Sequence, residues 1–177
     1  MTSILKGPRG APVMGVAGWK KSGKTTLVER LIVEFTRRGL KVSTVKHAHH
    51  DFQVDDAATD SARHRRAGAA QVAIVSSDRW AIVNELRNTP EPSLQDVLDK
   101  LEPCDLVLVE GYKTAPIPKI EARRREGHAG RALAENDSNV IAVASDYEIA
   151  DNTLPRFALD DISAIADFIL KTVGSRR

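Results

Sequence analysis

Short apolar runs separated by polar turns predict alternating strands and helices in the first part of the chain. Residues 13–17 form an unbroken apolar run, as buried strands do. Over residues 24–38 the apolar side chains recur at helical spacing, and Gly39 follows as a C-terminal cap. Residues 40–45 predict the next strand, so a strand–helix–strand unit opens the chain.

The middle of the chain predicts a short helix followed by a hairpin. Thr59 or Asp60 is placed to cap a helix that runs to about Ala67. Two apolar runs, 71–75 and 80–83, are separated by a polar turn, which favours an antiparallel hairpin. We expect this hairpin to extend the main sheet. A further helix is predicted over residues 93–101.

Three more strands and a closing helix are predicted in the remainder. Residues 105–111 (DLVLVEG) contain apolar positions without alternation, which indicates a central parallel strand covered on both faces. Residues 119–123 and 140–144 predict further strands, with a polar loop over 124–138, and 160–173 predict the last helix. This order of elements predicts an α/β fold with three layers, a mostly parallel sheet plus an antiparallel hairpin.

The first predicted strand leads into a glycine-rich motif, G-x-x-x-x-G-K-T, over residues 18–25. Gly18 and Gly23 permit backbone turns that bring N–H groups near phosphate oxygens, and the following helix directs its positive end to the same place. Lys24 is placed to reach β- and γ-phosphates, and the Thr25 hydroxyl to bind Mg²⁺. Strand, loop and amphipathic helix together predict a phosphate-binding loop, and the fold expected is P-loop NTPase-like.

A phosphate-binding loop needs an acidic residue near its metal, usually at the end of a neighbouring apolar strand. Glu110 ends the run 105–111, and Asp51 lies in a carboxylate-rich loop after the second predicted strand. We expect Thr25 with Glu110 or Asp51 to serve Mg²⁺, and the same two acids are the candidates for a catalytic role. The alternative interpretation of Glu110 is an acid that simply ends a strand.

The guanine-reading motif N-K-x-D does not occur in the chain. Asp146 follows the predicted strand 140–144, and a carboxylate there could accept hydrogen bonds from guanine N1 and N2. Asp146 is therefore a candidate base-reading residue, with an ordinary strand-end aspartate as the alternative. The expected nucleotide-binding residues are Gly18, Trp19, Lys20, Lys21, Ser22, Gly23, Lys24, Thr25, Thr26 and Asp146.

A histidine cluster, H-x-H-H, follows the second predicted strand as His47, His49 and His50. No cysteine or further histidine is close in sequence to complete a tetrahedral zinc site. We therefore expect these side chains to contact phosphate or a pterin-like anion, or to pack at a subunit boundary. Trp19, inside the glycine-rich loop, is expected to cover the nucleotide or a partner.

Composition narrows the function classes. The net charge of +2 is too small to indicate nucleic acid or a membrane as the main partner, and no long apolar stretch predicts a membrane span. The single cysteine, Cys104, excludes an intrachain disulfide and fits a cytoplasmic location. For 177 residues we expect one nucleotide-binding domain over 12–174, after a polar leader over 1–11.

Five stretches carry a resemblance to a known family: GWKKSGKTTL, VKHAHHDFQVD, TDSARHRRAGA, DLVLVEGYK and PKIEARR. In their order and spacing the chain resembles the MobB family, the molybdopterin-guanine dinucleotide biosynthesis adapter proteins, from about residue 12 to 170. The resemblance implies a dimeric protein that binds GTP and Mg²⁺, has weak intrinsic GTPase activity, and assists the guanylyltransferase that joins GMP to molybdopterin. It also implies a surface facing the pterin or the partner, formed by His47, His49, His50, Lys113 and Arg123.

Two other functions stay open from the residues. A small-molecule kinase would use the same loop, with Asp51 or Asp55 as its base and the loop 124–138 as its lid. A GTPase that serves another metallo-cofactor would share the histidines. The chain shows no second nucleotide-handling motif, no clear general base and no arginine finger at a fixed spacing, which favours an accessory protein that is at most a weak GTPase.

Overall fold

The computed structural model describes residues 5–48, 54, 58–127, 130–149 and 153–174. The chain divides into two compact units, Met1–His47 with Ser93–Arg177, and Ala48–Pro92. In the described residues no helix has both the length and the apolar character needed to cross a membrane. The expected single domain over 12–174 stays a prediction.

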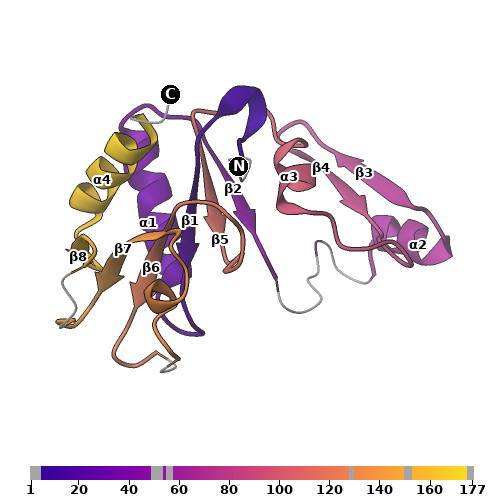
Figure 1. The fold of residues 1–177 in the computed structure, drawn as a ribbon. Coiled ribbons are helices and arrows are strands. Elements are labelled where there is room, and N and C mark those ends of the chain that lie inside the picture. The colour runs from indigo at the N-terminus through magenta and orange to yellow at the C-terminus, as the bar shows by residue number, and fades with distance from the viewer. Residues whose placement is uncertain (1–4, 49–53, 55–57, 128–129, 150–152, 175–177) are drawn as a thin grey trace. The chain divides into compact units, whose positions relative to one another are not determined.

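A six-stranded sheet forms the first unit, in the order β2-β5-β1-β6-β7-β8 (Figure 1). Every neighbouring pair is parallel, so the carboxyl ends of the strands meet at one edge. The loop that leaves β1 therefore emerges between the ends of β5 and β6. The strands are β1 (Val13–Ala17), β2 (Val42–Lys46), β5 (Leu106–Glu110), β6 (Lys119–Arg123), β7 (Val140–Ser145) and β8 (Arg156–Ala158).

Helices cover both faces of this sheet, which confirms the three-layer fold. On one face, α1 (Lys24–Arg37) and α4 (Ile162–Gly174) lie side by side (Figure 1). On the other face lies α3 (Leu94–Leu98), the short observed form of the helix expected over 93–101. Val13 and Met14 are adjacent in β1 and belong to the two different cores, because side chains alternate across a strand.

The second unit contains α2 (Asp60–Ala67) and a hairpin of β3 (Gln71–Val75) and β4 (Trp80–Asn84). The Thr59 hydroxyl accepts a hydrogen bond from the Ala62 N–H at 3.3 Å, as the predicted cap requires. The hairpin pairs antiparallel, but it forms a separate two-stranded sheet. The expectation that it extends the main sheet is wrong, because alternation along a strand does not specify the strand's partner.

Two 3₁₀ turns and a buried lysine complete the first unit. The turns are η1 (Pro8–Gly10) and η2 (Leu133–Glu135), the second inside the loop predicted over 124–138. Lys119 of β6 is fully buried, donates to the Lys113 carbonyl oxygen at 2.8 Å and pairs with Asp137. Gly15 of β1 makes room for it, since a Cβ there would lie 2.7 Å from Lys119 Cγ. Through its bonds to Lys113 and Asp137, Lys119 links the segment after β5 to the segment before β7.

Candidate nucleotide-binding site

The loop between β1 and α1 is closed by two glycines in conformations that other residues rarely adopt. Gly18 has φ +149° and Gly23 has φ +90°. A Cβ at Gly18 would lie 2.4 Å from Ser22 Oγ and 2.5 Å from the Ala122 carbonyl oxygen. Ser22 is buried, and its hydroxyl has no hydrogen-bond partner in the described part of the chain. A tight turn directly before a helix N-terminus is the geometry that binds phosphate.

The parallel sheet brings an acidic side chain to this loop. In the register of β1 and β5, Glu110 lies opposite Val16, two residues before Gly18. The Thr25 hydroxyl donates to Glu110 Oε1 at 2.8 Å, and Lys46 Nζ lies 3.5 Å from the same oxygen. Glu110 is only 8% exposed; the ammonium of Lys46 compensates its charge, and the Thr25 hydroxyl gives it a hydrogen bond.

Thr25 and Glu110 supply the hard oxygen atoms that Mg²⁺ prefers. The structure therefore brings together the predicted metal residue of the loop and one of the two predicted acids. Asp51, the other acid, lies outside the described residues, as does Asp55. The donor chemistry at Glu110 fits the expected metal.

Lys24 begins α1, and its Nζ donates to the carbonyl oxygen of Trp19 at 2.7 Å. Burial lowers the pKa of Lys24, Glu110 raises it, and Lys113 and Lys46 lower it again, so that it lies below the ordinary lysine value. Two further ammonium groups, those of Lys46 and Lys113, thus act on Lys24, and Glu110 is the one acid that acts on it. This local excess of positive charge favours an anion at the loop.

Trp19 connects the loop to a distant part of the chain. Its Nε1 donates to the Arg131 carbonyl oxygen at 2.9 Å, and Lys113 Nζ lies 4.2 Å from its ring centroid. A Cβ at Gly130 would lie 2.2 Å from the indole, so the ring packs closely on that glycine. The proposed role of Trp19 in covering a nucleotide or partner stays a prediction. The neighbouring Lys20 and Lys21 are exposed.

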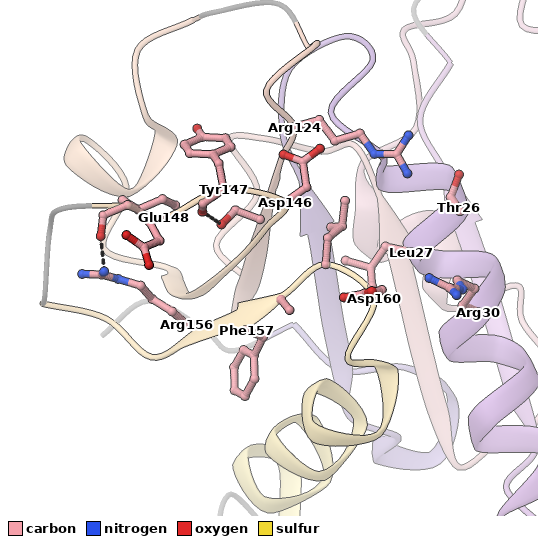
Figure 2. Close-up of a pocket in the computed structure, with 15 residues that line it drawn as sticks. Thr26, Leu27, Arg30, Arg124, Asp146, Tyr147, Glu148, Arg156, Phe157 and Asp160 are labelled. Atoms are coloured by element: carbon pink, nitrogen blue, oxygen red, sulfur yellow. Dashed lines mark hydrogen bonds between the residues drawn. The ribbon is translucent and has the colours of Figure 1, made fainter.

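A cavity of about 790 Å³ opens beside the start of α1 (Figure 2). It extends from Gly23 and Thr26 of the loop to Asp146 after β7 and to Phe157 in β8. Asp146 Oδ1 accepts the Arg125 N–H at 2.8 Å, which holds this carboxylate at the cavity wall. The cavity falls in the size range of small-molecule sites. Base reading by Asp146 stays a prediction.

Three of the residues predicted for the pterin or partner surface lie in the described part of the chain, and the structure shows a neighbour for each. His47 lies after β2, where its ring centroid is 4.8 Å from that of Tyr112, and Lys113 lies over Trp19. Arg123 donates to the buried Glu121 at 2.7 Å. Burial lowers the pKa of Arg123, but the hydrogen bond and charge of Glu121 raise it above the ordinary arginine value. His49 and His50 lie outside the described residues.

Sequence reasoning missed several residues of this region. Lys46 carries a signal that could have been used, since it ends the strand beside Glu110 and pairs with it in register. The β8 strand, which forms one cavity wall, is only three residues long and has no distinctive pattern. Arg124 lines the same cavity; the sequence offers it at the end of the stretch PKIEARR and at the start of the loop 124–138, the lid of the kinase alternative, but not as a neighbour of Gly23.

Comparisons with known proteins agree on one family. A family profile described as MobB, molybdopterin guanine dinucleotide synthesis protein B, matches residues 13–146. A molybdopterin-guanine dinucleotide biosynthesis adapter protein of Haemophilus influenzae is 44% identical over 162 residues, covering 89% of this chain and 87% of that protein. The protein of the same name from Escherichia coli is 37% identical over 163 residues, covering 90% and 92% respectively.

Solved structures agree as well. The crystal structure of a MobB homologue from Bacillus stearothermophilus matches with a TM-score of 0.69 at 28% identity, covering 92% of this chain and 98% of that one. The profile match runs from β1 to the residue after β7 and so includes the glycine-rich loop, Glu110 and Asp146. The chain therefore belongs to the MobB family of molybdopterin guanine dinucleotide synthesis proteins, and its role lies in molybdenum cofactor biosynthesis.

Proposed function

We propose that this chain is a GTP-binding adapter that assists the guanylyltransferase joining GMP to molybdopterin. The observation that carries the proposal is the Thr25–Glu110 hydrogen bond, which lies beside Lys24 in a loop closed by Gly18 and Gly23. The names of the relatives from Haemophilus influenzae and Escherichia coli refer to the same biosynthesis. The cytoplasm is the proposed location.

Each part of the loop has a proposed role toward Mg²⁺ and GTP. Backbone N–H groups of residues 18–26 would hold the phosphates, Lys24 the β- and γ-phosphates, and Asp146 the base. Thr25 and Glu110 would hold Mg²⁺, which when bound neutralises phosphate charge. Since Glu110 is assigned to Mg²⁺ and already accepts the Thr25 hydroxyl, we expect this adapter to hydrolyse GTP only slowly.

We also propose a homodimer, with the β3–β4 hairpin as its contact surface. A two-stranded sheet is marginal on its own in water. This one exposes large apolar side chains, with Val75 76%, Trp80 61% and Ile82 50% exposed. A second copy of the chain would cover them.

Capture of the guanylyltransferase tests the adapter role. The immobilised chain should retain the molybdenum cofactor guanylyltransferase, and GTP with Mg²⁺ should change the amount retained. Lys24→Ala should abolish that nucleotide effect, whereas Lys100→Ala, an exposed lysine after α3, should not. No capture in either nucleotide state would contradict the adapter. Acceptor-dependent phosphoryl transfer from ATP or GTP would instead favour a small-molecule kinase.

A further inference from the structure

Arg124 is a cation at the boundary between the phosphate-binding loop and the large cavity. It follows β6 directly and lines the cavity together with Gly23 and Thr26 (Figure 2). A Cβ at Gly23 would lie 3.0 Å from Arg124 Nε and 3.4 Å from Arg124 Cδ. The side chain therefore lies against the last residue before α1, where the helix N-terminus also favours negative charge.

The main chain around Arg124 is fixed from two sides. The Arg125 N–H donates to Asp146 Oδ1 at 2.8 Å, and the Gly127 N–H donates to the Arg124 carbonyl oxygen at 3.0 Å. Gly127 packs on the glycine-rich loop, since a Cβ there would lie 3.3 Å from the Lys21 carbonyl oxygen. Arg124 is thus held beside the loop by backbone contacts and needs no side-chain partner to stay there.

The guanidinium of Arg124 has no hydrogen-bond or ion-pair partner among the residues that the structure describes. By contrast, the preceding Arg123 is paired with Glu121, and Arg125 lies over the Tyr147 ring at 5.9 Å from its centroid. Arg124 itself extends toward the start of α1 (Figure 2).

We propose that Arg124 contacts the α-phosphate of the bound nucleotide, an inference that rests on the nucleotide binding proposed above. A nucleotide with its β- and γ-phosphates at Lys24 and its base near Asp146 must pass from the loop into the cavity at Gly23 and Thr26. The α-phosphate is the group that joins the two parts, so it lies at this passage. A guanidinium placed there is suited to a phosphate oxygen pair.

Competition binding tests this assignment, with a fluorescent guanine nucleotide displaced by GTP, GDP, GMP and guanosine in the presence of Mg²⁺. Arg124→Ala should weaken GTP, GDP and GMP by a similar factor of about tenfold, the lower end for a charge-assisted hydrogen bond at an exposed position. Guanosine, which has no phosphate, should be unaffected. Arg124→Lys should recover part of the loss. The matched control is Arg125→Ala, which removes the same charge one residue later and should change none of the four affinities.

Three outcomes would overturn the inference. Equal weakening of guanosine would place Arg124 on the base, and loss confined to GTP would place it on the γ-phosphate. Loss in Arg30→Ala with none in Arg124→Ala would transfer the role to Arg30, another arginine that lines the cavity. Failure of the proposed function is distinguishable, because then the unaltered chain would bind none of the nucleotides.

Discussion

Removing Asp137 should destabilise the protein more than removing Lys119, its partner in a buried ion pair. Lys119 is completely buried, whereas the Asp137 side chain is 22% exposed. Asp137 also accepts two hydrogen bonds from Asn139, at 2.9 Å from its N–H and 2.8 Å from its Nδ2. Within the described residues, the other partner of Lys119 is the Lys113 carbonyl oxygen alone. Loss of the carboxylate therefore isolates a buried charge, but loss of the ammonium leaves a carboxylate that keeps water and two donors.

The expected magnitudes follow from this inequality. Removing one partner of a buried ion pair costs about 3–5 kcal/mol, and the partial exposure of Asp137 favours the lower figure, about 3 kcal/mol for Asp137→Ala. Lys119→Met removes the buried charge itself and keeps an unbranched side chain against Gly15. We therefore expect it to lower the free energy of unfolding by only about 1 kcal/mol. The Lys119→Met/Asp137→Ala double variant should also lose about 1 kcal/mol of unfolding free energy, rather than the sum of the two single losses, about 4 kcal/mol.

Urea unfolding at neutral pH measures these free energies. Trp19 fluorescence in a Trp80→Phe background follows the unit that contains the pair, since Trp80 belongs to the hairpin unit. Equal losses in the two single variants, or additive losses in the double variant, would refute the assignment of an isolated buried charge at Lys119.

Three further predictions concern the loop and the pH response. Gly18→Ala should abolish GTP binding in titration calorimetry while the circular dichroism spectrum is retained, because its Cβ would lie 2.4 Å from Ser22 Oγ; normal affinity would contradict the tight loop. Glu110→Gln should weaken GTP at least about tenfold with Mg²⁺ but much less in EDTA, since the carboxylate is assigned to the metal; equal losses in both buffers would contradict that assignment. Burial raises the pKa of Asp137, but Lys119 and Asn139 lower it below the ordinary aspartate value overall. The stability it contributes is therefore complete above about pH 4 and is lost as the pH falls through the lowered pKa. The free energy of unfolding should fall more steeply below about pH 4 in wild type than in a Lys119→Met/Asp137→Asn variant, which lacks this titration, and equal slopes would contradict the assignment.

Features set by neighbouring residues could be predicted from the sequence. The glycine-rich loop is such a feature, because its turns, lysine and helix all lie within residues 13–38. The strand that ends in Glu110 is also predicted from its own residues, since an unbroken apolar run indicates a central strand, and the carboxyl ends of parallel strands share one edge. The first predicted strand and the first helix agree with β1 and α1 to within one residue.

Features set by contacts between distant residues could not be predicted. The position of Arg124 beside Gly23 depends on the pairing of β6 with β1 and on backbone bonds to Asp146. The buried Lys119 depends on a glycine in another strand, and a lysine in a strand pattern otherwise suggests exposure. The hairpin was predicted as an element, but its separation from the main sheet depends on which strand edges meet, information that strand periodicity lacks.

Isothermal titration of the purified chain with GTP in magnesium-containing buffer tests the central claim most directly. The proposed function predicts saturable binding of one GTP per chain, reduced at least about tenfold in Lys24→Ala because the β- and γ-phosphates lose their ammonium partner. Absence of binding to any purine triphosphate by the unaltered chain, or equal affinity of the Lys24→Ala variant, would contradict it.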